Sequence, residues 1–193
     1  MAGFIDEFMK TYGPEVTKQM SANFGLDQST VQKLIPQLVP LILGGLKRQK
    51  DERGGEARVD HILNKYGDQS VLDNIQDLIS NKASASAVDP NLGGLLGTEG
   101  GLQAAQVLGK SLNIDASKIM KMIPALAPLI LGALTRKRDT GGGGISGIGS
   151  LLDADGDGSI IDDVAGFLLK GAASQGKGKG ILGSILGSMF RTK

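Results

Sequence analysis

The acidic segment LDADGDGSIIDD near the C-terminus has the residue types and spacing of a metal site. Three aspartates stand at alternate positions, followed by a glycine and a serine, as in the first half of an EF-hand calcium loop. Carboxylates spaced in this way converge on one hard cation, and a backbone carbonyl at the seventh position adds another oxygen ligand. The segment predicts a calcium site formed by Asp153, Asp155, Asp157, Ser159, Asp162 and Asp163.

The end of this loop departs from the EF-hand pattern. Its twelfth position is Val164, where a bidentate glutamate normally completes the shell, so Asp162 or Asp163 must substitute through altered geometry or water. One isolated loop also lacks the paired arrangement of calcium sensors, so we expect calcium in a structural role. Two alternatives stay open, which are magnesium and an empty acidic turn whose aspartates stabilise the start of the following helix.

Residues for catalysis are scarce. The chain has no cysteine, so it has no thiol nucleophile, no disulfide and no cysteine-ligated metal. His61 is the single histidine; it lies in an amphipathic helical pattern, and no Gly-x-Ser-x-Gly nucleophile motif accompanies it. We therefore predict that the protein is not an enzyme and that His61 lies at the surface or at a helix boundary.

The elements around the acidic loop include an internal repeat. A shift of 88 positions aligns residues 27–51 with 115–139 without a gap, and 14 of the 25 pairs are identical. The sequence thus divides into five parts: helical unit one at 1–51, a helical hairpin connector at 52–88, helical unit two at 89–139, a glycine-rich linker at 140–150, and a C-terminal part at 151–193 with the acidic loop, a short helix and an amphipathic tail.

Each unit is expected to contain three helical segments, the first of them short. The predicted segments are 4–10, 14–24 and the stretch after Asp27 in unit one, and 91–97, 102–112 and the stretch after Asp115 in unit two. Asp27 and Asp115 are candidate N-caps, with Ser29 and Ser117 as competitors. The connector predicts a hairpin broken at Tyr66–Gly67, with Asp68 as a cap.

The third helix of each unit combines an apolar face with an internal proline stripe. At helical spacing the prolines fall on a different side from the apolar residues. Since proline lacks the backbone amide, the helix is either continuous and curved or broken before the first proline. The predicted apolar faces are Ile35, Leu38, Val39, Ile42 and Leu46, and Ile123, Leu126, Ala127, Ile130 and Leu134. The stripes are Pro36, Pro40 and Gly44, and Pro124, Pro128 and Gly132.

The two third helices raise two possible interactions, with a membrane and with nucleic acid. The apolar block 123–134 would extend about 18 Å as a helix, against roughly 30 Å of membrane hydrocarbon, so we predict no transmembrane span. Basic clusters end both third helices and offer an alternative function in nucleic-acid binding, although cations also complement the helix dipole there. The residues concerned are Lys47, Arg48, Lys50, Arg136, Lys137 and Arg138.

Charge, composition and the two ends of the chain add weaker constraints. The formal net charge is +1, so nothing demands a polyanionic partner, and aromatic residues make up 4%, so the core must be aliphatic. The N-terminus has no recognisable secretory signal, which favours the cytoplasm, with unconventional export left open. The amphipathic tail is expected to dock on the body or to self-associate, through Ile181, Leu182, Ile185, Leu186 and Phe190.

The stretch LNIDASKIMKMIPALAPLILGALTRKR, followed by glycines, LLDADGDGSIIDDVAGFLL and a Gly-Leu-rich basic end, resembles the bacterial YidB-like family, a domain of unknown function. The resemblance covers mainly residues 89–193, and residues 1–51 are similar to a duplicate of its helical half. It implies an all-helical fold and a bacterial source, but no reaction or partner. Its metal pattern carries over to Asp153, Asp155, Asp157, Asp162 and Asp163.

The sequence therefore predicts an all-α protein with two homologous multi-helix units packed as a bundle around a shared aliphatic core, plus the calcium loop and glycine-rich tail. We expect a non-enzymatic interaction or assembly protein in which calcium orders the C-terminal part. Its expected partner is protein, including self-association through the helical units or the tail. The alternative is a nucleic-acid-binding regulator that uses the basic helix ends.

Overall fold

The computed structural model describes residues 3–97 and 99–141. This part of the chain is all-helical and contains no strand, which confirms the predicted fold class. The predicted calcium loop and glycine-rich tail lie outside the described residues. The helices are α1 (Phe4–Thr11), α2 (Gly13–Phe24), α3 (Gln28–Arg53), α4 (Gly55–Tyr66), the 3-10 helix η1 (Gln69–Leu72), α5 (Ile75–Ser84), α6 (Gly100–Leu112) and α7 (Ala116–Thr140).

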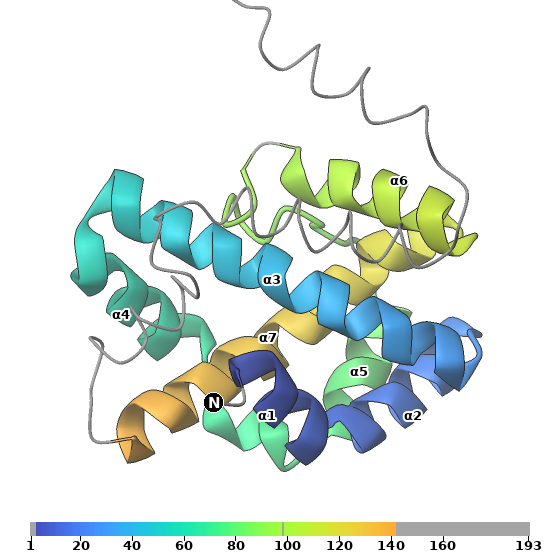
Figure 1. Ribbon diagram of the computed structural model, residues 1–193, viewed down its shortest axis with the longest axis horizontal. Helices are drawn as coiled ribbons and strands as arrows, with labels where there is room; N and C mark the ends of the chain where they lie inside the picture. Colours follow the sequence, from blue (N-terminus) through green and yellow to red (C-terminus); the bar gives the residue numbers. More distant parts are fainter. Residues whose placement is uncertain (1–2, 98, 142–193) are drawn as a thin grey trace, which may run out of the picture.

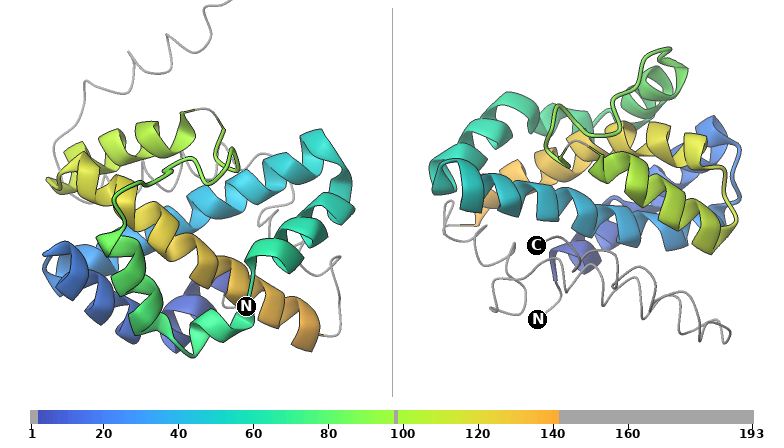
Figure 2. Two further views of the ribbon diagram at one scale, coloured as in Figure 1. Left: turned by 180° about the vertical axis from the view of Figure 1, so that it is seen from behind. Right: turned by 90° about the horizontal axis from the view of Figure 1, so that it is seen from above.

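Helix α7 runs through the middle of the molecule, and the other helices pack around it (Figure 1). It contacts α2, α3, α4, α5, α6 and η1. The view from behind in Figure 2 shows α7 crossing the molecule diagonally. One continuous apolar core includes side chains from both repeat units and from the connector. The two units are therefore held together by a shared aliphatic core.

The two third helices differ in how far they are buried. The predicted apolar faces of α3 and α7 are buried, as expected. In α7, however, Met122, Ala125, Leu129 and Ala133 are buried as well, on other sides of the helix. A single apolar face was therefore the wrong prediction for α7, because six elements surround it.

Both proline-containing helices are continuous. Helix α3 passes through Pro36 and Pro40 and α7 through Pro124 and Pro128, so the alternative of a helix break before the first proline is wrong. An internal proline costs about 3 kcal/mol of helix stability. Burial of one large aliphatic side chain contributes roughly 1.5–3 kcal/mol, and each helix buries many, so packing outweighs the cost.

Helix α7 is the one described helix that is long and apolar enough to cross a membrane by length and composition. The prediction from residues 123–134 underestimated this length, because the continuous helix has 25 residues. Its most apolar window is 72% buried by the rest of the fold. Within this structure α7 is therefore the core helix.

The same aspartate begins both third helices. The Asp27 carboxylate accepts a hydrogen bond from the Thr30 amide at 2.8 Å, and Asp115 accepts one from the Ser117 amide at 2.8 Å. The predicted aspartate caps are thus confirmed, and the competing serines are not caps. Ser29 instead donates its hydroxyl to Asp27 at 2.6 Å.

The predicted short helix at 91–97 is wrong, because this segment forms successive turns. Leu92, Gly93 and Gly94 have φ values of 53°, 63° and 85°, in the left-handed region that a right-handed helix excludes. The Asp89 carboxylate accepts hydrogen bonds from the amides of Asn91 and Gly93 at 2.9 and 2.6 Å. These local bonds compete with helix formation, which the glycines already disfavour.

The connector is helical, but its two helices do not pack along each other as a hairpin. Helix α4 packs on α3 and α7, whereas α5 packs on α2 and α7. The predicted break at Gly67 and the cap at Asp68 are confirmed, since Asp68 accepts from the Ser70 amide at 2.9 Å. At this break the chain crosses α7 so closely that a Cβ on Gly67 would lie 2.3 Å from Thr135 Oγ1.

Replacing Gly132 by alanine tests this close crossing. A Cβ at Gly132 would lie 2.8 Å from the Asp68 carbonyl oxygen, which belongs to the backbone and cannot rotate away. We expect G132A to lower the free energy of unfolding by roughly 1–3 kcal/mol in urea denaturation, despite the higher helix propensity of alanine. The matched control is G13A in α2, where the added Cβ meets only the flexible Met9 side chain. Equal stability of G132A and G13A would contradict the crossing.

The capping aspartates predict a loss of stability at low pH. Hydrogen bonds from Ser29 and Thr30 lower the pKa of Asp27, and those from Ser117 lower the pKa of Asp115. Because the folded pKa is depressed, the contribution is present above the ordinary aspartate pKa of about 3.9 and is lost as pH falls below it. Asparagine still caps helices but does not titrate. In urea titrations from pH 6 to pH 2, the D27N/D115N variant should therefore lose less stability than the wild type; identical profiles would contradict the assignment.

Candidate binding groove

A cavity of about 780 Å³ opens between α3, α4, the segment 85–97 and α7. Its volume lies within the range of ligand sites in proteins. The lining side chains separate by chemistry into an apolar floor and a charged rim. The floor consists of Ile62, Leu95, Pro124, Ala127, Pro128 and Leu131, and the rim carries Arg48, Arg53, Arg58 and Lys82 together with Glu52 and Asp89.

Two glycines reverse the chain between α3 and α4. Gly54 and Gly55 have φ values of 130° and 64°, which side chains other than glycine rarely adopt. The reversal brings Arg53, the last residue of α3, and Arg58, in the first turns of α4, to the same groove. The Arg58 Nε donates a hydrogen bond to Gln49 Oε1 at 3.1 Å, which joins the two helices.

The wall formed by the turns at 90–97 is attached to α3. Arg48 donates from Nη2 to the carbonyl oxygens of Gly94 and Leu95 at 3.0 and 2.8 Å. The backbone of α3 also approaches the backbone of this wall closely, since a Cβ on Gly45 would lie 2.8 Å from the Leu95 carbonyl oxygen. The wall is therefore positioned by one arginine and one glycine of α3.

The rim has a positive charge excess, with four cations and two anions. Arg53 and Lys82 have no hydrogen-bond or ion-pair partner within the part of the chain that the structure describes. The Asp89 carboxylate already accepts two backbone amides. Two cations thus face the groove opening without an internal carboxylate.

The sequence did not identify this groove. The prolines of α7 were interpreted as residues that set the shape of the helix, whereas Pro124 and Pro128 lie in the groove floor. The signal available in the sequence was the separation of the proline stripe from the apolar face. Pro124 and Pro128 are half-buried and line the groove. This part of the stripe is therefore a surface of α7 that is available for contact.

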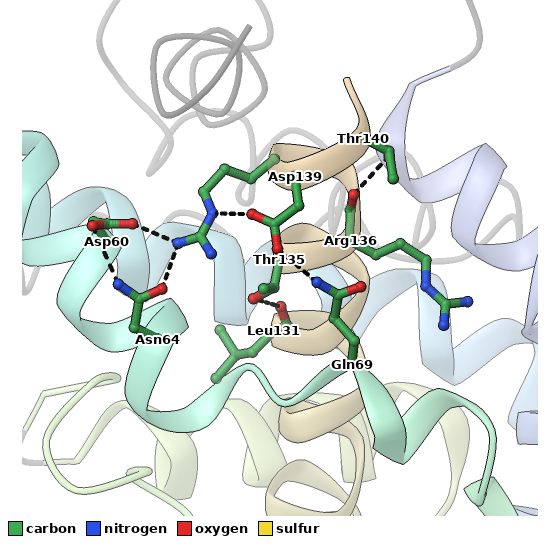
Figure 3. A network of polar contacts seen from close by, with 9 residues as sticks. Asp60, Asn64, Gln69, Leu131, Thr135, Arg136, Asp139 and Thr140 are labelled. Atoms are coloured by element: carbon green, nitrogen blue, oxygen red, sulfur yellow. Dashed lines mark hydrogen bonds and ion pairs between the residues drawn. The ribbon is translucent and has the colours of Figure 1, made fainter. Parts of the chain in front are cut away.

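The basic end of α7 is bound to the rest of the fold (Figure 3). Arg138 Nη1 contacts Asp60 Oδ1 at 2.5 Å and Asn64 Oδ1 at 2.8 Å, and its Nε donates to Asp139 at 2.8 Å. The hydrogen bond with Asp139 and the charge of Asp60 raise the pKa of Arg138. These contacts fix the end of α7 against α4.

The other two cations of this end reach unit one. Arg136 donates to the Tyr12 hydroxyl at 3.1 Å and pairs with Asp73 at 3.6 Å. Lys137 forms an ion pair with Glu7 in α1. Because Glu7 lies in α1 and Tyr12 directly follows this helix, the basic end of unit two holds the start of the other unit.

The basic end of α3 is arranged reciprocally. Lys47 is 8% exposed and pairs with Asp51 at 3.6 Å, whereas Lys50 is half-exposed. Arg48 binds Gly94 and Leu95, which belong to the first segment of unit two. Of the predicted nucleic-acid residues, Arg48 thus holds a groove wall, and Lys47, Arg136, Lys137 and Arg138 form internal ion pairs. Lys50 does neither within the part of the chain that the structure describes.

The metal prediction concerns residues elsewhere in the chain. Asp153, Asp155, Asp157, Ser159, Asp162 and Asp163 lie outside the described residues. Within 3–97 and 99–141, no group of three histidine, cysteine, aspartate or glutamate side chains is placed to hold a metal ion. His61 is exposed on α4, as predicted.

A family model of bacterial proteins of unknown function, DUF937, matches residues 6–137 and, a second time, residues 95–191. The first match alone spans more than half of the sequence. The chain belongs to the DUF937 family. This confirms the predicted membership of a bacterial family without an assigned function, and two overlapping matches are consistent with a duplicated helical part. No curated protein and no solved structure matches the chain.

Replacing Arg48 tests how the wall of the groove is held in this DUF937 protein. R48M keeps much of the aliphatic stem but removes both hydrogen bonds to the wall. We expect faster amide hydrogen exchange at residues 91–97, by about tenfold for a loss of roughly 1.4 kcal/mol. R53M is the matched control, because Arg53 has no partner among the described residues. Similar exchange in both variants would show that Arg48 does not hold the wall.

Proposed function

We propose that this DUF937 protein is a non-enzymatic interaction or assembly protein, with a structural calcium ion that orders its C-terminal part. The groove between α3, α4 and α7 is the observation that supports the proposal most directly. It combines apolar lining side chains with cations at the opening. That combination suits a protein segment with apolar side chains and acidic neighbours.

The chemistry of the rim favours carboxylates. Guanidinium groups bind carboxylates through two parallel hydrogen bonds, and Arg53 has both edges of its fork uncommitted within the described fold. Lys82 adds a point charge near the same opening. A partner segment is therefore expected to place aspartate or glutamate at the rim and aliphatic or aromatic side chains on the floor.

Nucleic-acid binding has less support as an alternative. Arg136, Lys137 and Arg138 already face carboxylates of Asp73, Glu7 and Asp60. Contact with phosphate would require these pairs to break, with loss of contacts between helices. We therefore propose a protein partner, which includes a second copy of this chain. We also propose that the protein is located in the cytoplasm.

Light scattering on the full chain tests the assembly proposal. We expect a mass above that of one chain, rising with protein concentration, because association obeys mass action. Calcium should raise the assembled fraction or sharpen the size distribution if it orders the C-terminal part. A strict monomer at all concentrations, with calcium and with EDTA, would overturn the assembly proposal.

Calorimetry separates the calcium claim from assembly. Titration of calcium into the full chain should release or absorb heat that D155N/D157N abolishes, because neutral amides replace two of the alternating carboxylates. D77N in α5 is the control for a simple loss of negative charge, since Asp77 lies outside the acidic loop. No heat with the unaltered chain would refute calcium binding.

A further inference from the structure

We propose that the groove is the docking site of the chain's own acidic segment, residues 151–169, which binds it within the same molecule. The inference rests on the proposed function, because it names the segment that occupies the proposed interaction site. Three observations carry it: the charges of groove and segment, the length of the linker, and the apolar floor.

The charges of the groove and of residues 151–169 are complementary. This segment contains five aspartates and no lysine or arginine. The groove opening carries four cations and two anions, and the cations Arg53 and Lys82 have no partner among the described residues. The remaining stretch, 170–193, contains five basic residues and no acidic one, so the same rim repels it. Charge thus selects the acidic segment over the basic tail.

The length of the linker suits docking within one molecule. Leu131 lies in the groove floor and Thr140 ends α7, so the start of the linker is about 14 Å along the helix from the groove. Residues 141–150 include six glycines, and a flexible ten-residue chain of this kind has a root-mean-square span of roughly 17 Å. Because the span of the linker matches this distance, the effective concentration of the segment at the groove is in the millimolar range. A second molecule would need a comparable concentration to compete.

The apolar content of the segment matches the floor. Residues 160–169 include two isoleucines, one valine, one phenylalanine and two leucines. The floor presents proline, alanine and leucine side chains of α7 between the charged margins. Tyr66, which also lines the groove, is 54% exposed although it is a large hydrophobic residue. Docking would bury this ring together with the apolar side chains of the segment.

The absence of cysteine from the chain allows a sharp test. A nitroxide spin label attached to A165C in the full chain, in EDTA, should broaden amide signals of the groove residues Lys82, Ala87 and Gly94. The signal of Lys10, on α1, should keep its intensity. EDTA excludes calcium, so the result does not depend on the metal claim.

Two further arms test charge and connectivity. R53E/K82E should restore most of the lost groove intensity, and so should 1 M salt, which shortens the Debye length to about 3 Å without any substitution. R53E/K82E changes residues without internal partners, and the salt arm needs no variant to fold. A mixture of spin-labelled and isotope-labelled chains should show no broadening, because the segment docks within its own molecule.

Three results would overturn the inference. Weak, uniform broadening over the whole body would show that the segment does not dock. Broadening unaffected by both R53E/K82E and salt would remove the charge-based recognition. Broadening in the mixture as strong as in the single chain would assign the groove to a second copy. A strict monomer in light scattering would refute assembly but leave this docking intact, so the two proposals fail separately.

Discussion

The central position of α7, which six other elements contact, is the constraint on which the rest of the structure depends. A helix surrounded by six elements needs small residues where backbones approach it, and Gly132 meets this need at the Asp68 carbonyl. The connector must cross at that point, and Gly67 makes the crossing possible from the other side. Once the crossing is fixed, α4 and α5 are directed to different neighbours, and α4 becomes a wall of the groove.

The groove is a consequence of the same helix. Pro128 has no amide to donate to the Pro124 carbonyl, so that oxygen lacks its usual helical donor. Both prolines lie in the groove floor, on a stripe that α4 leaves open. The two prolines thus give the floor an apolar surface.

The sequence was sufficient for the features that depend on local chemistry or periodicity. The aspartate caps, the break at Gly67 and the buried faces of α3 and α7 follow from side-chain hydrogen bonding and helical spacing. The turns at 91–97 were missed because alignment with 4–10 transferred a helix onto a stretch with three glycines and the Asp89 turn. The groove was missed because it combines residues from α3, α4 and α7, whose packing no local pattern specifies.

The two copies have kept one reciprocal interaction while their burial diverged. Arg48 and Arg136 occupy the same position of the repeat, 88 residues apart. Arg48 binds the turns that begin unit two, and Arg136 binds Tyr12 in the first part of unit one. Each third helix therefore holds the start of the other unit through its basic end.

These reciprocal contacts between the two units explain the basic helix ends in structural terms, without nucleic-acid binding. Cations at the end of a helix complement its dipole, and here they also find acceptors on the other unit. In unit one the partner is a pair of carbonyls, so the attached segment can be a turn rather than a helix and can form a groove wall. In unit two Arg136 binds the Tyr12 hydroxyl and the Asp73 carboxylate, and Lys137 binds Glu7 on α1. The arginine at this position of the repeat therefore has two roles. Arg48 holds a turn segment that forms a groove wall, whereas Arg136 holds the junction after α1 against the end of α7.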